Sequence, residues 1–193
     1  MQDNNQLITK QQLSRNHHTG GVLWFTGLSG AGKTTLSQTV QHKLCAEGFQ
    51  IYVLDGDIIR TGLCSDLGFS PQDRRENLRR VGEVAKLFAD AGFIVISAFI
   101  SPYSEDRQRV RNLTPNLFHN IYIKADVRTC EQRDVKGLYA KARAGEIKHF
   151  TGISAPYEVP AQPDLIIDTM HHTVEESSAQ LIQYIKKHFT LET

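Results

Sequence analysis

The sequence predicts a three-layer α/β domain, in which a mainly parallel five-stranded sheet carries helices on both faces. Three observations lead to this fold class. Short runs rich in β-branched and aromatic residues alternate with longer segments of helical periodicity. The short runs are apolar on successive residues, as expected for parallel strands that crossover helices bury on both faces. The first run leads directly into a glycine-rich loop and then into a helix.

The expected elements follow in chain order. Strands are predicted from the apolar runs VLWFTG, IYVLDGD, FIVISAFIS, NIYIKAD and DLIIDT, at 22–27, 51–57, 93–101, 120–126 and 164–169. Helices are predicted from periodicity at about 33–47, 71–91, 104–112, 128–143 and 174–188. Residues 1–19, rich in Gln and Asn, are expected to form an arm outside a single domain of residues 20–193.

Composition limits the function classes. The 193 residues fit one compact domain, and 22 basic residues against 21 acidic ones leave a formal net charge of +1. No global charge therefore favours nucleic acid or an anionic membrane as a partner. The N-terminus lacks the apolar core of a signal peptide, and the apolar run at 93–100 is too short to cross a bilayer. We expect a soluble cytoplasmic protein.

Cysteines and paired histidines give no metal signal. The three cysteines are widely spaced and form no Cys-x-x-Cys pair, so we interpret Cys45, Cys64 and Cys130 as ordinary thiols. The histidine pairs lie at the edges of the domain, and we expect His17, His18, His171 and His172 at the surface.

The most specific motif is GLSGAGKT at 27–34, which matches G-x-x-x-x-G-K-[ST] between a predicted strand and a predicted helix. Such a P-loop turns backbone N–H groups toward phosphate oxygens, and the following helix points its N-terminus at them. Lys33 is expected to reach the β and γ phosphates and Thr34 to bind Mg²⁺. The domain is therefore of the P-loop NTPase type. We expect ATP to be bound by Gly27, Leu28, Ser29, Gly30, Ala31, Gly32, Lys33, Thr34 and Thr35.

Carboxylates for the reaction are expected after the second strand. The guanine-reading Asn-Lys-x-Asp pattern is absent, and the strand at 93–101 ends in Ser101-Pro102 rather than in an acid. Asp55 and Asp57 follow the second strand, so they should face the same crevice as the P-loop. A carboxylate there can organise Mg²⁺ or accept a proton. The alternative interpretation of Asp-Gly-Asp is a polar turn that caps the next helix.

The helix predicted at 71–91 brings arginines to its N-terminal end. Ser70 as N-cap, Pro71 at the first helical position and Asp73 two residues later are start signals. Leu78, Val81, Ala85 and Phe88 form an apolar stripe, whereas Arg75, Glu76, Arg79, Arg80, Glu83 and Lys86 fall on the opposite, solvated side.

Arg74 and Asn77 instead continue the apolar stripe toward the crevice. A buried guanidinium needs an anion, and its planar fork suits phosphate or sulfate. An internal salt bridge is the alternative for Arg74. Arg60 is a candidate second fork on a short helix, with a surface position as its alternative.

The chain resembles adenylylsulfate kinases in five motifs, which occur in the order GLSGAGKTT, LDGDIIR, FSPQDRRENLRRVGEVAKLFADAG, FISPY and KGLYAKARAGEIKHFTGISAPYE. The resemblance runs from about Gly21 to Asp168. It implies that MgATP phosphorylates the 3′-hydroxyl of adenosine 5′-phosphosulfate, giving 3′-phosphoadenosine 5′-phosphosulfate and ADP. It also suggests a homodimer.

The resemblance implies roles for individual residues. Asp57 would be the catalytic base and, with Thr34, a metal organiser, and Lys33 would act on the phosphates. The adenylylsulfate site would be lined by Asp55, Arg60, Phe69, Arg74, Asn77, Ile100, Ser101, Lys136 and Phe150, with Phe69 stacked on a purine. Residues 136–152 would form a mobile lid, for which the alternative is a basic surface helix and loop.

Ser101 matches the position at which the family is described with a phosphoserine. A buried serine without a partnered base is a poor nucleophile, so we favour contact with substrate. Two other hypotheses are another small-molecule P-loop kinase, acting on a nucleotide or a sugar acid, and a nucleotide-responsive binding module. The intact Lys33, Thr34, Asp55 and Asp57 disfavour the binding module.

Overall fold

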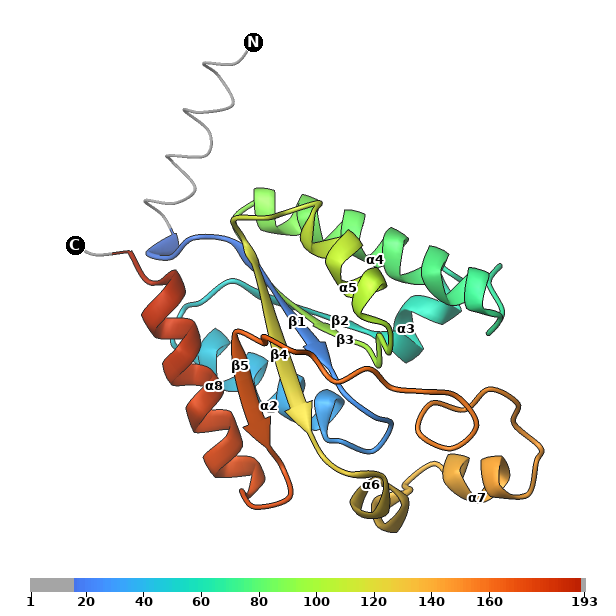
Figure 1. The fold of residues 1–193 in the computed structure, drawn as a ribbon. Helices are drawn as coiled ribbons and strands as arrows, with labels where there is room; N and C mark the ends of the chain where they lie inside the picture. The colour runs from blue at the N-terminus through green and yellow to red at the C-terminus, as the bar shows by residue number, and fades with distance from the viewer. Residues whose placement is uncertain (1–15, 192–193) are drawn as a thin grey trace.

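A computed structural model describes residues 16–191 and has the predicted three-layer architecture (Figure 1). In this part of the chain one sheet has the strand order β2-β3-β1-β4-β5, and all neighbouring strands are parallel. The strands are β1 (Gly21–Thr26), β2 (Ile51–Asp55), β3 (Ile94–Ala98), β4 (Phe118–Lys124) and β5 (Leu165–Asp168). Each overlaps a predicted strand, and the parallel order confirms the fold class.

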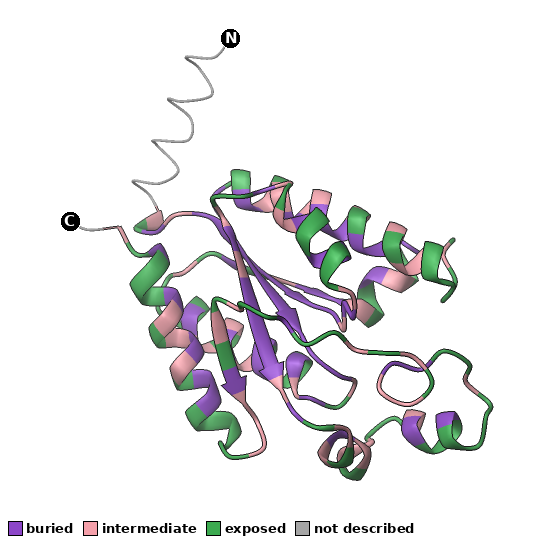
Figure 2. Cartoon of the chain, in the orientation of Figure 1, coloured by how far each residue is buried: buried purple, intermediate pink, exposed green. Residues whose placement is uncertain are grey.

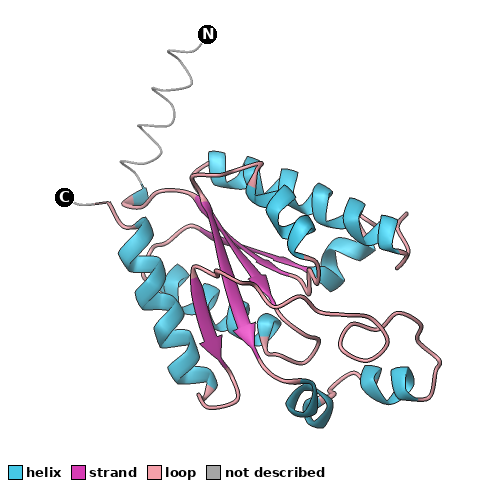
Figure 3. Cartoon of the chain, viewed as in Figure 1, coloured by secondary structure: helices cyan, strands magenta, loops and turns pink. Residues whose placement is uncertain are grey.

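Helices cover both faces of the sheet (Figure 3). They are α2 (Lys33–Ala46), α3 (Gly56–Thr61), α4 (Pro71–Asp90), α5 (Ser104–Arg111), α6 (Val127–Arg133), α7 (Leu138–Arg143) and α8 (Val174–Phe189). Helices α2 and α8 pack on one face, and α4 and α5 on the other. The chain crosses from one side of β1 to the other between β3 and β4, which leaves a crevice at the carboxyl ends of the strands.

The central strand divides the core between the two helical layers. Leu23 and Phe25 of β1 join the apolar cluster on the α2 and α8 face, whereas Val22 and Trp24 join the cluster under α4. Side chains alternate across a strand, so a strand buried on both faces must be apolar throughout. Figure 2 shows this strand buried along its length while the outer faces of the helices are exposed.

Helix α4 begins as predicted. Ser70 Oγ accepts the Asp73 N–H at 3.1 Å, and Pro71 occupies the first turn. Leu78, Val81 and Ala85 are buried against the sheet. This capping fixes the direction in which the arginines that follow leave the helix.

Three of the four arginines of α4 pair with acids. Arg80 pairs with Glu76 at 2.9 Å and Arg79 with Glu83 at 3.6 Å, both on the side of the helix that was predicted to be solvated. Arg75 is exposed, as predicted, and its Nε also lies 3.3 Å from the buried carboxylate of Asp106 in α5. Neighbouring α5 supplies an acid that the helical pattern of α4 does not reveal.

The single helix predicted at about 128–143 is also wrong. Helix α6 ends at Arg133 and α7 begins at Leu138. The carboxylate of Asp134 accepts the N–H groups of Tyr139 at 3.0 Å and of Ala140 at 3.1 Å, so it starts a new helix instead of continuing the old one. The break brings α7 to the crevice.

Residues 16–19 lie against the domain. His18, expected at the surface, is 1% exposed, stacks on Phe49 and accepts the Gln50 N–H at 2.9 Å through Nε2. His17, His171 and His172 are exposed as expected. The other residues of the predicted arm, 1–15, lie outside the described residues.

Two further expectations from the sequence concern the cysteines and membrane-spanning segments. Cys45, Cys64 and Cys130 are free thiols, and the last two are buried. Within residues 16–191, no helix combines the length and the apolar character that a membrane span requires.

Candidate active site

One large cavity lies at the carboxyl ends of the strands. Its volume is about 1400 Å³, above the roughly 300–1,000 Å³ of ordinary small-molecule pockets, so it has room for two nucleotide-sized ligands. Most of the predicted site residues line it, namely Ser29, Gly30, Gly32, Lys33, Thr34, Thr35, Asp55, Asp57, Arg60, Phe69, Arg74, Asn77, Ile100, Ser101, Lys136 and Phe150. Gly27, Leu28 and Ala31 of the predicted set do not line the cavity and are buried residues of the same loop.

The P-loop has a backbone that favours glycine. Gly30 and Gly32 have φ angles of 77° and 99°, in the left-handed region. A Cβ atom on Gly30 would also lie 3.0 Å from the carbonyl oxygen of Cys130. Gly32 is the N-cap of α2, so the first N–H groups of this helix are available to an anion in the cavity.

Lys33 is buried and folded back onto the P-loop. Its Nζ donates to the carbonyl oxygens of Gly27 at 2.9 Å and Leu28 at 2.7 Å. Burial disfavours the charged ammonium and lowers the pKa of Lys33 from 10.5 to about 8. The phosphates of a bound nucleoside triphosphate would take the place of these two carbonyl oxygens as acceptors for Lys33.

The affinity for a non-hydrolysable ATP analogue is expected to fall as the pH rises above about 8. The free protein binds the phosphates best when Lys33 is protonated, and its pKa of about 8 means that the charge is lost above that pH. Binding raises this pKa, so the dissociation constant should increase by up to about tenfold per pH unit. Titrations from about pH 7 to 9.5 measure the slope. Lys33→Met should be flat, and parallel curves for the two proteins would contradict the assignment.

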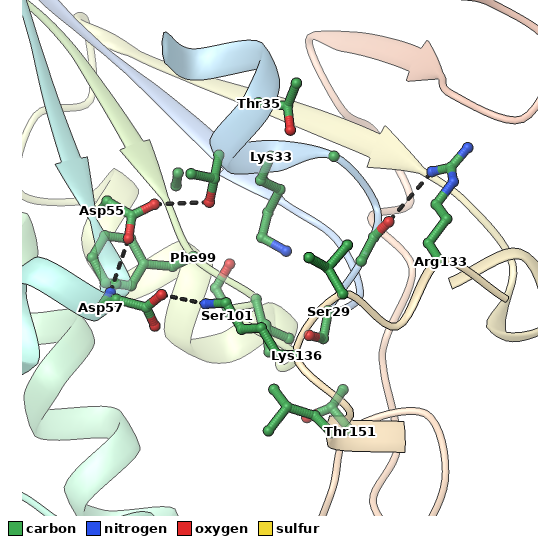
Figure 4. Close-up of a pocket in the computed structure, with 18 of the residues that line it drawn as sticks. Ser29, Lys33, Thr35, Asp55, Asp57, Phe99, Ser101, Arg133, Lys136 and Thr151 are labelled. Atoms are coloured by element: carbon green, nitrogen blue, oxygen red, sulfur yellow. Dashed lines mark hydrogen bonds and ion pairs between the residues drawn. The ribbon is translucent and has the colours of Figure 1, made fainter. Parts of the chain in front are cut away.

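Two aspartates near the end of β2 make different polar contacts (Figure 4). Asp55 Oδ2 accepts the hydroxyl of Thr34 at 2.8 Å, and Asp55 Oδ1 accepts the Asp57 N–H at 3.0 Å. Both interpretations of the Asp-Gly-Asp motif therefore hold for Asp55, which caps α3 and also faces the P-loop. Asp57 is more exposed, and its carboxylate pairs with Lys136 across the cavity.

Arg74 contacts only carbonyl and hydroxyl oxygens. Its guanidinium donates to Phe69 O at 3.0 Å, His149 O at 3.2 Å and Thr151 Oγ1 at 3.4 Å. No carboxylate of the described residues pairs with it, unlike its helix neighbours. Burial, together with repulsion from Arg60, lowers the pKa of Arg74. The arrangement favours an anionic ligand over an internal salt bridge.

Two guanidinium groups lie near the ring of Phe69 at the cavity wall. The ring is 65% exposed, and its centroid is 4.3 Å from the guanidinium carbon of Arg60 and 5.9 Å from that of Arg74. Arg60 is held in place by the Gly68 carbonyl at 2.9 Å. Cation–π contact orders an aromatic surface on which a base can stack.

Two buried polar residues complete this wall. Asn77 is 3% exposed, and its Nδ2 has no hydrogen-bond partner within residues 16–191. An unpaired buried amide is costly, so a ligand acceptor is its natural partner. Ser101 is 2% exposed and has a φ of 38°, which is strained for a residue other than glycine. The carbonyl of Ile100 beside it accepts the Thr26 hydroxyl at 2.8 Å.

The segment 136–152 contacts both walls of the cavity. Lys136 reaches Asp57, and His149 and Thr151 accept from Arg74. Phe150, which was expected to line the adenylylsulfate site, is buried here and packs edge-on against Tyr139 with ring centroids 4.9 Å apart. The segment therefore closes the cavity through polar contacts with Asp57 and Arg74, and Tyr139, Ala142 and Phe150 anchor it in the core cluster on the α2 and α8 face.

Three residues of the cavity were not singled out from the sequence. Arg133 donates to Gly30 O at 3.3 Å and to Thr169 Oγ1 at 3.1 Å, and it braces the P-loop from α6 (Figure 4). Thr169 in turn donates to Ala31 O at 2.9 Å, and Tyr139 OH donates to Ser29 O at 2.9 Å. The position of Thr169 at the end of the last predicted strand was the available signal.

Comparisons with known proteins identify a family and several relatives. The family model for adenylylsulphate kinase matches residues 19–168. The adenylyl-sulfate kinase of Staphylococcus epidermidis is 55% identical over 184 residues, covering 95% of this chain and 92% of that protein. That of Geotalea uraniireducens is 58% identical over 174 residues, covering 90% and 84%.

A solved structure of an APS kinase is similar to this chain over most of its length. The APS kinase CysC of Mycobacterium tuberculosis, in complex with AMPPNP and APS, superposes with a TM-score of 0.84 at 46% identity. The match covers 87% of this chain and 98% of that one.

Proposed function

This chain belongs to the adenylylsulfate kinase family, and we propose that its cavity holds MgATP at the P-loop and adenosine 5′-phosphosulfate between α4 and the segment 136–152. The enzyme transfers the γ-phosphoryl group of ATP to adenosine 5′-phosphosulfate and gives 3′-phosphoadenosine 5′-phosphosulfate. The relative from Mycobacterium tuberculosis was solved with AMPPNP and APS together.

One observation carries this placement. The cavity has a P-loop on one wall and, on the other, a half-buried Arg74 without a carboxylate partner among the described residues. A second anion accounts for a fixed guanidinium there, since unpaired buried charge is unfavourable. The phosphosulfate group supplies that anion, and Phe69 offers its face to the adenine.

The chain's own groups then have distinct tasks in the transfer. Lys33 leaves its carbonyl partners to contact the β and γ phosphates, and the N-terminus of α2 binds them through backbone N–H groups. Arg74 and Asn77 hold the acceptor. Asp57 accepts the proton of the attacking 3′-hydroxyl after release from Lys136. Fixing the two reactants in line is most of the catalysis that phosphoryl transfer needs.

Mg²⁺ fits the oxygen donors at the P-loop. It is bound in proteins through one or two oxygen ligands and substrate phosphates, with water in the remaining positions. The hydroxyl of Thr34, which lies 2.8 Å from Asp55, would be one such ligand. The carboxylate of Asp57, two residues after Asp55, would be the other. When bound, the ion neutralises charge that develops on the β and γ phosphates.

The segment 136–152 is proposed to act as a lid. Its polar contacts with Asp57 and Arg74 can exchange for ligand contacts, while Tyr139 and Phe150 keep the segment packed on the core. We further propose a cytoplasmic homodimer, as the resemblance to the family suggests.

A coupled ADP-release assay tests the acceptor. Rapid ADP formation is expected with adenosine 5′-phosphosulfate, and little with AMP or gluconate at the same concentration. A preference for AMP or gluconate would reject the assignment of the anion site and favour another small-molecule kinase.

A further inference from the structure

Trp24 belongs to the core, but it contacts the cavity wall through one hydrogen bond. The side chain is fully buried in β1, where Phe99 and Phe118 stack on it with centroid distances of 5.7 and 6.0 Å. Its indole N–H donates to Ser101 Oγ at 3.0 Å. Ser101 lies among the residues that line the cavity with Lys33 and Asp57 (Figure 4). The indole N–H of this core residue therefore contacts a side chain of the candidate active site.

This bond fixes the role that the Ser101 hydroxyl can play. An indole N–H only donates, so Ser101 Oγ is the acceptor and keeps its own proton for another partner. Within residues 16–191, Ser101 Oγ makes no second hydrogen bond. Because Ser101 faces the cavity, a ligand oxygen is the acceptor available to its proton.

The backbone of Ser101 is held independently of any ligand. Arg107, itself 4% exposed, donates to Ser101 O at 2.6 Å, and Thr26 Oγ1 donates to the same oxygen at 3.3 Å. The second terminal nitrogen of Arg107 donates to Glu158 O at 2.7 Å. These buried contacts keep Ser101 in its strained left-handed conformation, and strain of this kind is retained where it organises a site.

We propose that Trp24 is a positioning residue whose indole N–H orients the Ser101 hydroxyl as a hydrogen-bond donor to an anionic oxygen of the acceptor substrate. The inference rests on the proposed placement of adenosine 5′-phosphosulfate beside Ser101. The bond uses one of the two Oγ lone pairs and leaves the hydroxyl proton free to donate. Ser101 then binds the acceptor through that proton.

The experiment uses the fact that the chain has a single tryptophan. Biosynthetic replacement by benzothienylalanine, which has sulfur in place of the indole N–H, changes only position 24. The KM for adenosine 5′-phosphosulfate should rise about 5- to 10-fold, because a hydrogen bond to a charged oxygen loses its orientation. The KM for ATP should stay within about twofold. Trp24→Phe serves as a genetically encoded second variant with the same expected direction.

Ser101→Ala completes a double-mutant cycle. Alone it should raise the KM for adenosine 5′-phosphosulfate about tenfold or more, and the tryptophan replacement should then add less than about twofold. Phe118→Leu is the packing control, because Phe118 stacks on Trp24 but does not line the cavity. It should lower the melting temperature without changing this KM.

The outcomes separate the inference from the proposed function. An unchanged KM in Ser101→Ala would reject the placement of the acceptor beside Ser101. A raised KM in Ser101→Ala with no effect of the tryptophan replacement would overturn the inference alone. An equal effect of the replacement with and without the Ser101 hydroxyl would also overturn it, since Trp24 would then act through packing.

Discussion

Asp57→Asn is expected to lower kcat by about 10²- to 10⁴-fold, the usual contribution of a general base, with little change in the KM for ATP. Asp55 is buried and already committed to Thr34 and to the start of α3. Asp57 instead projects into the cavity from the first turn of α3, with Lys136 as its ion-pair partner. Asn has nearly the same shape but cannot take the proton of the 3′-hydroxyl. Steady-state rates with both substrates saturating measure the loss.

Two variants separate the base from its neighbours. Asp55→Asn should weaken the orientation of Thr34, so added Mg²⁺ should restore part of its activity. Asp57→Asn should recover much less, because added Mg²⁺ can offset a weakened metal contact but cannot accept the proton of the 3′-hydroxyl. Lys136→Met removes the ion pair and leaves the carboxylate, and it should act chiefly on the KM values. A loss of less than about tenfold in Asp57→Asn, or full rescue by Mg²⁺, would exclude Asp57 as the base.

The sequence predicted the layers of the fold because their signals are local. An apolar strand followed by a glycine-rich loop identifies β1 and α2, and Ser70-Pro71 marks the start of α4. The break between α6 and α7 was missed because it depends on the Asp134 side chain, which caps the second helix. An aspartate in a charged, helical stretch has the same appearance whether it faces water or a backbone N–H.

Site residues were predictable where they lie in a motif and not where a tertiary contact creates their role. The P-loop and the two aspartates precede or follow predicted strands, so the edge of the sheet brings them together. Arg133 reaches the P-loop from α6, and the sequence gives no reason to prefer it over other surface arginines. Trp24 looks like a core residue, and only the position of Ser101 gives its N–H a function.

Charge pairing explains why one helix serves both the surface and the site. Arg75, Arg79 and Arg80 have acids within reach, either on α4 itself or on its neighbours. Arg74 leaves the same helix in line with the core and meets only neutral oxygens. A difference of one residue in sequence thus decides between a solvated ion pair and an anion-binding fork.

Arg74→Ala is therefore expected to raise the KM for adenosine 5′-phosphosulfate about 30-fold or more, as when one partner of a buried charge pair is removed. The ATP site lies on the opposite wall, so the KM for ATP should change little. Arg74→Lys keeps the charge but loses the planar fork, and it should fall between wild type and Arg74→Ala. Initial rates over a range of each substrate give the two constants.

Arg79→Ala is the matched control, because Arg79 leaves the same helix, is about half exposed and pairs with Glu76 and Glu83. Its KM for adenosine 5′-phosphosulfate should stay within about twofold of wild type, since exposed ion pairs contribute little. Melting temperatures of both variants distinguish lost binding from lost folding. Equal effects of the two substitutions, or an equal rise in both KM values for Arg74→Ala, would show that Arg74 does not hold the acceptor. A selective rise would leave the phosphosulfate as the anion that this unpaired guanidinium binds.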